Sequence, residues 1–134
     1  MTPMLMQLLA VAVGGAIGGV ARFWLSAFVA RRFGEAFPWG TLAVNVSGAA
    51  TIGVLAAIML APDTHAVDHV PAWTGLVVGI LGSYTTVSTF SLETLALVRA
   101  NEPGLAVRNI VASLLLCLGA ATVGYAGVLW FLGG

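Results

Sequence analysis

The sequence predicts an all-α membrane protein built from four transmembrane helices. Of its 134 residues, 60% are hydrophobic and only 7% are charged, a balance that soluble domains do not show. A helix needs about 20 mostly apolar residues to cross a bilayer, and the chain contains four stretches of that length. A chain of this size supports one domain, so we expect residues 1–134 to form a single transmembrane unit. The four predicted spans are residues 4–30, 40–61, 72–98 and 105–132.

The first span, residues 4–30, is expected to be a retained helix and not a cleaved signal peptide. It lacks a basic N-terminal region, and its apolar run is longer than the roughly 7–15 residues of a signal sequence. Small residues at every fourth position let membrane helices approach closely, and this span has two overlapping GxxxG pairs. The glycines expected to form a packing seam are Gly14, Gly15, Gly18 and Gly19.

The second and third spans carry the same small-residue spacing. A phosphate-binding loop is excluded as an explanation, because no strand precedes these glycines and no Lys follows them. The small residues expected to pack are Gly48, Ala49 and Gly53 in the second span, and Gly75 and Gly79 in the third.

The third span is predicted to break near its middle, between Gly82 and Thr86. The segment GSYTTVSTFS, residues 82–91, is rich in Gly, Ser, Thr and β-branched residues, which are poor helix formers. A break inside a bilayer frees carbonyls and amides that need partners, and transport proteins use such breaks to coordinate ions. Freed carbonyls suit a small monovalent cation, whereas hydroxyl and amide donors suit an anion.

Polar side chains recur at helical spacing on three of the spans. A hydroxyl in a membrane helix often bonds only its own i−4 carbonyl, but an amide cannot satisfy all its groups that way. These rows therefore favour a polar path through the bundle. The rows are Thr41 and Asn45 in the second span, Asn109, Ser113 and Cys117 in the fourth, and Ser83, Thr86, Val87, Phe90 and Glu93 on two overlapping faces of the third.

The arginines predict the orientation of the chain. All five basic residues are Arg, and four of them, Arg31, Arg32, Arg99 and Arg108, lie in or near the first and third connections. The positive-inside rule places those connections in the cytoplasm and both termini outside. Arg22, inside the first span, either extends to the cytoplasmic surface or lies in an aqueous vestibule that attracts anions.

The second connection contains two histidines, His65 and His69, with Asp63 and Asp68 beside them. No Cys and no third well-placed ligand accompanies the histidines. We therefore interpret this connection as a solvated external loop and assign no metal to it.

Taken together, the motifs resemble those of the small bacterial fluoride channels, the Fluc or CrcB family. The resemblance covers the whole chain and implies a passive, fluoride-selective channel of the bacterial inner (plasma) membrane that confers fluoride resistance and is not an enzyme. It also implies an antiparallel dimer with a sodium ion at the centre of its interface. The motifs are Gly14-Gly15 through Arg22-Phe23-Trp24, Trp39-Gly40-Thr41-Leu42 with Val44-Asn45, and residues 79–90 followed by Glu93.

Carried over by position, the resemblance assigns the sodium-binding backbone carbonyls to Gly82 and Thr85. Fluoride is small and tightly hydrated, so a conduit must replace its water with closely spaced donors and the positive edges of aromatic rings. The residues that the resemblance assigns to the fluoride path are Thr41, Asn45, Ser88, Thr89, Phe90, Asn109 and Ser113.

The chain departs from the family pattern at two positions. The family has Thr-Thr-Phe-Ser-Thr-Phe where this chain has Val87 as the third residue, and Ser83 stands where a Gly is expected after Gly82. A Val side chain has no ring edge, so one aromatic contact of the fluoride route is missing from this subunit. Glu93 is interpreted as a helix-end or network residue and not as a proton carrier.

The arginine distribution also bears on the partner. A homodimer of inverted copies needs nearly balanced loop charges, whereas this chain is expected to insert in one orientation. We therefore predict a heterodimer with a homologue of opposite topology, with the homodimer as the alternative, and no nucleic-acid partner. Two other functions stay open. One is a proton-coupled multidrug exporter, although that mechanism requires a carboxylate in the first span and this span has only Gln7 and Arg22. The other is a nonconducting subunit that stabilises a partner.

Overall fold

The computed structural model describes residues 2–60 and 71–133, and the regular secondary structure of those residues is entirely helical. The second connection, with the residues around His65 and His69, lies outside the described residues. Four helical segments in the described part are long and apolar enough to cross a membrane, which makes the chain a multi-pass membrane protein. The helices are α1 (Pro3–Phe33), α2 (Trp39–Leu60), α3 (Pro71–Tyr84), α4 (Val87–Arg99) and α5 (Pro103–Gly133), and α3 and α4 together form the third span.

Local sequence signals define both ends of α1. The hydroxyl of Thr2 accepts a hydrogen bond from the Leu5 N–H at 3.3 Å, and Pro3 occupies the first turn, where no amide donor is needed. At the other end Gly34 adopts a φ of 84° and its N–H donates to the Ala30 carbonyl at 2.8 Å. The helix therefore runs three residues further than the predicted span before it ends at Phe33.

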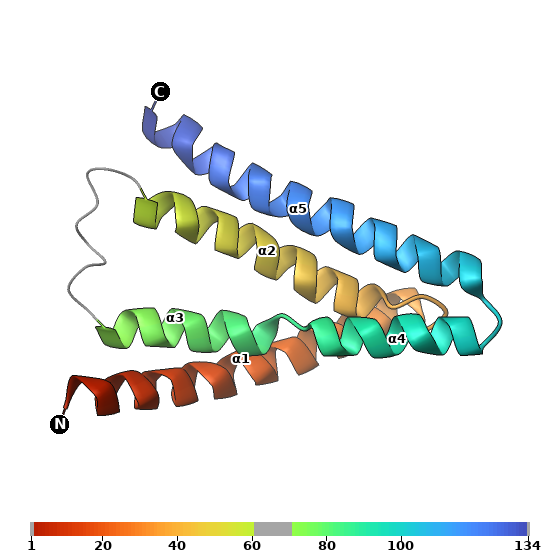
Figure 1. Ribbon diagram of the computed structural model, residues 1–134, viewed down its shortest axis with the longest axis horizontal. Helices are drawn as coiled ribbons and strands as arrows, with labels where there is room; N and C mark the ends of the chain where they lie inside the picture. Colours follow the sequence, from red (N-terminus) through yellow and green to blue (C-terminus); the bar gives the residue numbers. More distant parts are fainter. Residues whose placement is uncertain (1, 61–70, 134) are drawn as a thin grey trace.

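The predicted break in the third span is confirmed and lies at residues 85–86. α3 ends at Tyr84, and Thr86 has an extended backbone with φ of −151° and ψ of 123°. The Thr86 hydroxyl caps the next helix by accepting the Thr89 N–H at 3.1 Å, so α4 starts as a new helix at Val87. In Figure 1 the two half-helices follow one another with a short irregular link between them.

The helices pack as two main pairs, α1 with α3 and α2 with α5 (Figure 1). In the first pair a Cβ at Gly14 would lie 2.5 Å from the Leu76 carbonyl oxygen, and a Cβ at Gly18 would collide with the Ile80 backbone. Gly79 lies against the Val11 carbonyl in the same way. Glycine is required at these positions because the two backbones touch, as the GxxxG spacing predicts.

The second predicted pair in α1, Gly15 with Gly19, does not form a helix seam. A Cβ at Gly19 would have no atom within 4 Å, and one at Gly15 would meet only the Ser83 hydroxyl at 3.4 Å. Two GxxxG pairs offset by one residue point about 100° apart around a helix, so only one of them can face α3. That prediction was wrong for Gly19.

The α2–α5 pair uses two glycines that face opposite backbones. A Cβ at Gly53 would collide with the Ala121 backbone, and one at Gly124 would lie 2.5 Å from the Ala50 carbonyl oxygen. Gly53 was predicted to pack, whereas Gly124 was not singled out, although Ala120 lies four positions before it.

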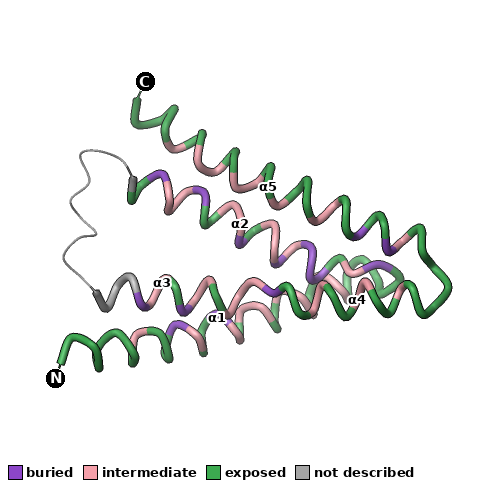
Figure 2. The backbone as a smooth tube through the Cα atoms, viewed as in Figure 1, coloured by how far each residue is buried: buried purple, intermediate pink, exposed green. Residues whose placement is uncertain are grey.

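Both termini lie at one end of the bundle, and the α1–α2 and α4–α5 connections lie at the other (Figure 1). This arrangement agrees with the predicted distribution of loops between the two sides of a membrane. Figure 2 shows that most of the surface of α5 and the outer face of α1 are exposed. The buried apolar side chains are only Phe37, Leu42, Val44, Ala57 and Ala106 among the described residues. A single chain therefore has a small interior.

Candidate functional site

Two neighbouring cavities lead from the α1–α2 connection toward the helix break. The outer one, of about 580 Å³, lies between that connection, α4 and the start of α5. The inner one, of about 330 Å³, reaches Thr86 and Thr89 at the start of α4. Ser26, Ala30 and Thr41 line both cavities, so the two meet at Thr41.

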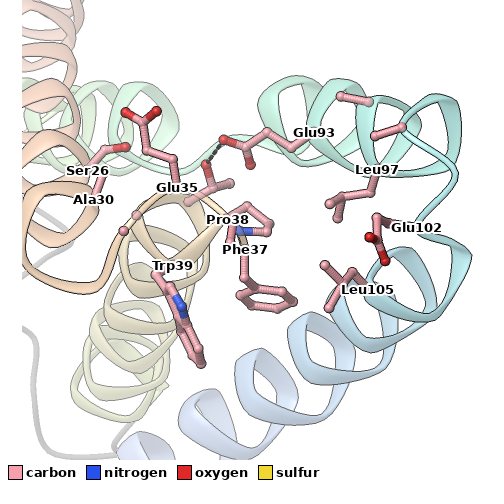
Figure 3. A pocket seen from close by; sticks show the side chains of 16 residues that line it. Ser26, Ala30, Glu35, Phe37, Pro38, Trp39, Glu93, Leu97, Glu102 and Leu105 are labelled. Carbon is pink, nitrogen blue, oxygen red and sulfur yellow. Dashed lines mark hydrogen bonds between the residues drawn. The ribbon is translucent and has the colours of Figure 1, made fainter.

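The outer cavity is lined by three acidic residues and an aromatic wall. Figure 3 shows Glu35, Glu93 and Glu102 around it, with Phe37 and Trp39 packed together on one side. The two rings lie 4.7 Å apart, and the guanidinium carbon of Arg108 sits 4.4 Å from the Phe37 ring centroid. A cation over an aromatic face is held in place electrostatically, so Arg108 fixes the first turns of α5 against the α1–α2 connection.

The inner cavity combines one positive charge with several hydroxyl groups. Arg22 lines it together with Thr41, Thr86 and Thr89. Because the side chain of Arg22 borders a polar cavity and not only the lipid-facing surface, its placement favours the vestibule interpretation over a purely structural anchor. The Thr41 hydroxyl donates to Glu93 and the Thr86 hydroxyl donates to the Thr89 oxygen at 3.1 Å, so a small anion in this cavity would find the Arg22 charge and, of the three hydroxyls, the Thr89 O–H as the available donor.

Thr41 and Glu93 connect α2 to α4 at the point where the cavities meet. The Thr41 hydroxyl donates to Glu93 Oε1 at 2.9 Å, the bond drawn as a dashed line in Figure 3. Thr41 is only 4% exposed. Glu93 Oε2 is buried and has no hydrogen-bond partner among the described residues, so one acceptor of the carboxyl group is left open. The structure thus places Glu93 in a polar network, as predicted.

Asn45 bonds the backbone of the helix break with both ends of its amide. Its Nδ2 donates to the Thr86 carbonyl at 2.8 Å, and its Oδ1 accepts the Thr86 N–H at 2.8 Å. Gly48, one turn further along α2, allows the close approach, since a Cβ there would collide with the Thr85 side chain. We refer to the two bonds between Asn45 and Thr86 as the Asn45–Thr86 clamp.

The backbone of the break leaves the carbonyls of residues 82–85 without their ordinary helical donors. In an α-helix each N–H bonds the carbonyl four residues earlier. The Thr86 N–H, which would bond the Gly82 carbonyl, donates to Asn45, and the Thr89 N–H, which would bond the Thr85 carbonyl, donates to the Thr86 hydroxyl at 3.1 Å. Gly82 and Thr85, to which the resemblance assigns the sodium site, are therefore two of the four residues of this stretch whose carbonyls lose their helical donors.

Several residues of the break face outward from the single chain. Val87 is 76% exposed, and Gly82 and Ser88 are also exposed. Ser83, Thr89 and Phe90 are half-buried. A polar stretch in the middle of a transmembrane span is thus open on the surface of one subunit.

The polar row of α5 begins with a residue that joins two helices. Asn109 is 2% exposed, and its Nδ2 donates to the Thr94 hydroxyl at 2.9 Å. Thr94 in turn donates to the Phe90 carbonyl at 2.7 Å. Asn109 therefore ties α5 to the turn of α4 that carries Phe90, whereas Ser113, one turn further along α5, is half-buried.

Two polar contacts near the break were not anticipated from the sequence. The Tyr84 and Ser47 hydroxyls lie 2.7 Å apart, which fixes the last residue of α3 to α2. Thr94 is the intermediate in the Asn109 contact described above. Spacing along one helix cannot reveal such pairs, because each partner lies on a different helix. In contrast, the hydroxyls of Thr85, Ser91 and Thr122 bond carbonyls of their own helices, as many hydroxyls in membrane helices do.

Comparison with known proteins identifies the family. Residues 9–125 match the family model described as CrcB-like protein, Camphor Resistance (CrcB). A protein of Rhodopseudomonas palustris strain BisB18 named Fluoride-specific ion channel FluC 2 is 54% identical over 94% of this chain and 95% of its own length. Fluoride-specific ion channel FluC 3 of Brucella suis is 48% identical over 91% of each chain, and FluC 2 of Bradyrhizobium diazoefficiens is 47% identical over 87% of this chain and 85% of its own. The four-span fold, the broken third span and these matches together show that the chain belongs to the CrcB-like family.

Proposed function

We propose that the chain is a subunit of a passive, fluoride-selective channel that exports fluoride from the cytoplasm. Relatives that share about half of its residues over nearly their whole length are named fluoride-specific ion channels. The observation that carries the proposal within the structure is the inner cavity, where Arg22 stands beside the hydroxyls of Thr41, Thr86 and Thr89 at the helix break.

This cavity offers the interactions that a dehydrated fluoride needs. The Thr89 O–H can point toward an anion, the Thr41 and Thr86 hydroxyls can do so by giving up their bonds to Glu93 and Thr89, and the Arg22 guanidinium raises the local concentration of anions. Phe90 and the polar row with Ser113 would continue the route on α4 and α5. A lattice of closely spaced donors favours a small anion over chloride, because the larger ion cannot approach several donors at once.

A sodium ion belongs to the proposal as a structural cation. Hard oxygen atoms such as backbone carbonyls suit a small monovalent cation, and Gly82 and Thr85 have carbonyls whose helical donors are diverted to Asn45 and Thr86. The residues present therefore fit the ion. When bound, sodium would supply a fixed positive charge that satisfies these carbonyls within the membrane.

The exposed break supports a dimer. Lipid offers no hydrogen-bond partner to polar backbone, so the exposed stretch around Gly82 and Ser88 needs protein to cover it. A second subunit packed antiparallel on this face would bring the carbonyls of its own helix break to the same place. The arginine distribution favours a homologue of opposite topology as that subunit, with both termini of this chain outside the cell.

Val87 favours a second candidate role for this chain. The side chain is 76% exposed on the proposed dimer face and carries no aromatic ring. Under this alternative the subunit completes and stabilises the dimer, while ions pass only along the route that the partner's aromatic residues complete. The multidrug-exporter alternative receives no comparable support, since the relatives are named as fluoride channels.

Fluoride efflux from liposomes tests the proposal. Three preparations would be compared: this chain alone, this chain together with a homologue whose loop arginines are distributed in the opposite way, and that homologue alone. We expect fluoride efflux well above that of empty vesicles for the pair and no chloride efflux. Efflux at the level of empty vesicles for every combination would contradict the channel proposal, and efflux from the homologue alone equal to that of the pair would favour the stabilising role.

A further inference from the structure

We infer that Asn45 is a positioning residue that holds the helix break open and so creates the cation-binding carbonyl at Gly82. The inference rests on the proposed function, because the sodium ion is part of that proposal. It assigns to Asn45 a structural task in addition to any contact with fluoride, and it makes the sodium site depend on a side chain of α2 that does not itself bind the ion.

The first step is the fate of one backbone donor. In a continuous helix the Thr86 N–H would bond the Gly82 carbonyl, four residues earlier. In this structure Asn45 Oδ1 accepts that N–H at 2.8 Å. The preceding amide, that of Thr85, still donates to the Leu81 carbonyl at 3.0 Å. The helical pattern of α3 therefore stops at the Thr86 N–H, the first donor that no longer bonds the preceding turn and the one that Asn45 takes.

The second step is that Thr86 has no equally good alternative to Asn45. Thr86 is only 8% exposed, and its carbonyl accepts a hydrogen bond from Asn45 Nδ2 at 2.8 Å. Its side chain is already used to cap α4 through the Thr89 N–H at 3.1 Å. A buried backbone group without a hydrogen-bond partner is destabilising. Without Asn45, the Thr86 N–H would gain most by returning to the Gly82 carbonyl, which would then be occupied.

The third step concerns what is left of the amide for an anion. An Asn side chain has two donor hydrogens and two acceptor lone pairs, and the clamp uses one hydrogen and one lone pair. Asn45 can therefore give an anion at most one hydrogen bond while it holds the break. The sodium site and the fluoride route would then be coupled through one side chain, since moving the amide toward an anion weakens the clamp.

The test compares variants at position 45 by their sodium-dependent thermal stability. Asn45→Leu has the same branched shape but no acceptor, and the hydroxyl of Asn45→Ser ends one bond closer to α2 and falls short of Thr86. Asn45→Asp, measured at a pH low enough to keep its carboxyl group protonated, keeps an oxygen that accepts the Thr86 N–H and an O–H that can donate to the Thr86 carbonyl. Thr51→Val on the same helix is the matched control, because the Thr51 hydroxyl bonds only the Ser47 carbonyl of α2.

Melting of the purified assembly in detergent would be measured in sodium chloride and in N-methylglucamine chloride at equal ionic strength. We expect sodium to raise the melting temperature of the wild type, Asn45→Asp and Thr51→Val. In Asn45→Leu and Asn45→Ser the shift should be lost at the same sodium concentration, with sodium affinity lower by about 10- to 100-fold, as for other residues that orient metal ligands. If Asn45→Leu does not fold, Asn45→Ser decides.

Three results would overturn the inference. The first is a wild-type sodium shift in Asn45→Leu or Asn45→Ser, and the second is loss of the shift in Asn45→Asp as well, which would show that the acceptor is not what matters. The third is a wild type without any sodium shift, which would remove the sodium site itself. Fluoride efflux of the wild-type pair, measured in parallel, tests the channel proposal separately.

Discussion

The Thr41 hydroxyl donates to Glu93 Oε1 at 2.9 Å, which links the start of α2 to the middle of α4 where the two cavities meet. Thr41→Val removes this donor and leaves the carboxyl group with a second open oxygen. We expect a loss of stability of about 1–3 kcal/mol and lower fluoride efflux from the reconstituted pair. Thr51→Val, which removes only a bond within α2, should leave both quantities near the wild-type value, and equal effects of the two variants would contradict the role of the Thr41–Glu93 contact.

The α1–α3 seam predicts that two adjacent glycines differ strongly in how substitution by Ala affects stability. Gly18→Ala would drive a methyl group into the Ile80 backbone, whereas Gly19→Ala would enter open space. We expect Gly18→Ala to lower the free energy of unfolding by about 1–3 kcal/mol. Gly19→Ala should change it by less than about 0.5 kcal/mol, as surface substitutions generally do. Thermal unfolding in detergent measures both, and similar melting temperatures for the two variants would contradict the seam.

Restoring an aromatic ring at Val87 tests the missing contact of the fluoride route. Because Val87 is 76% exposed, a Phe side chain fits there without displacing any residue of the same chain. If this subunit contributes to a conducting route, Val87→Phe should raise fluoride efflux of the pair several-fold. Leu92→Phe, at a position on α4 that is 67% exposed, is the matched control. Unchanged efflux in Val87→Phe would favour the stabilising role for this chain.

The α5 row predicts that two neighbouring polar residues act differently. Asn109→Ala removes the tie to Thr94 inside the protein and should cost about 1–3 kcal/mol of stability. Ser113→Ala should leave the stability almost unchanged but lower fluoride efflux, because Ser113 is proposed to lie on the route. Thermal unfolding and liposome efflux on the same preparations separate the two effects. A large stability loss in Ser113→Ala would show that Ser113, too, is a structural residue.

Orientation is tested by labelling with a membrane-impermeant thiol reagent. In a Cys117→Ala background, Thr2→Cys should react from outside intact cells, and Glu102→Cys, in the α4–α5 connection, should react only after the membrane is opened. The reason is the excess of arginine near the α1–α2 and α4–α5 connections. Labelling of both cysteines in intact cells would indicate insertion in two orientations and would favour a homodimer.

Composition and helical spacing predicted the parts of the fold that depend on one helix at a time. The four spans, the break between Gly82 and Thr86 and the packing role of Gly14, Gly18 and Gly79 follow from residue types that lipid and close helix packing require. The pairing of α2 with α5 through Gly124 was not predicted, because small-residue spacing shows which helix faces can pack closely but not which helix each face meets. The same limit explains why Gly19 was wrongly included, since its spacing from Gly15 does not say whether another helix lies against that face.

The residues of the candidate site were predicted from the sequence, but the hydrogen bonds between them were not. Asn45 stood out because an amide in a membrane helix needs partners on another helix, yet nothing in the sequence indicates that both partners belong to the Thr86 backbone. Glu93 was expected in a network, and its bond to Thr41 joins residues 52 positions apart. Contacts of that range depend on how the helices pack and are visible only in three dimensions.

The interleaved pairing of α1 with α3 and α2 with α5 affects how the chain assembles during synthesis. When α2 enters the bilayer, α5, its main packing partner, has not yet been translated, and α1 likewise waits for α3. The nascent chain must therefore hold its first two spans in lipid with few helix–helix contacts, and the bundle can close only after the last span has been inserted. Truncation before α5 should leave α2 exposed to membrane quality-control proteases.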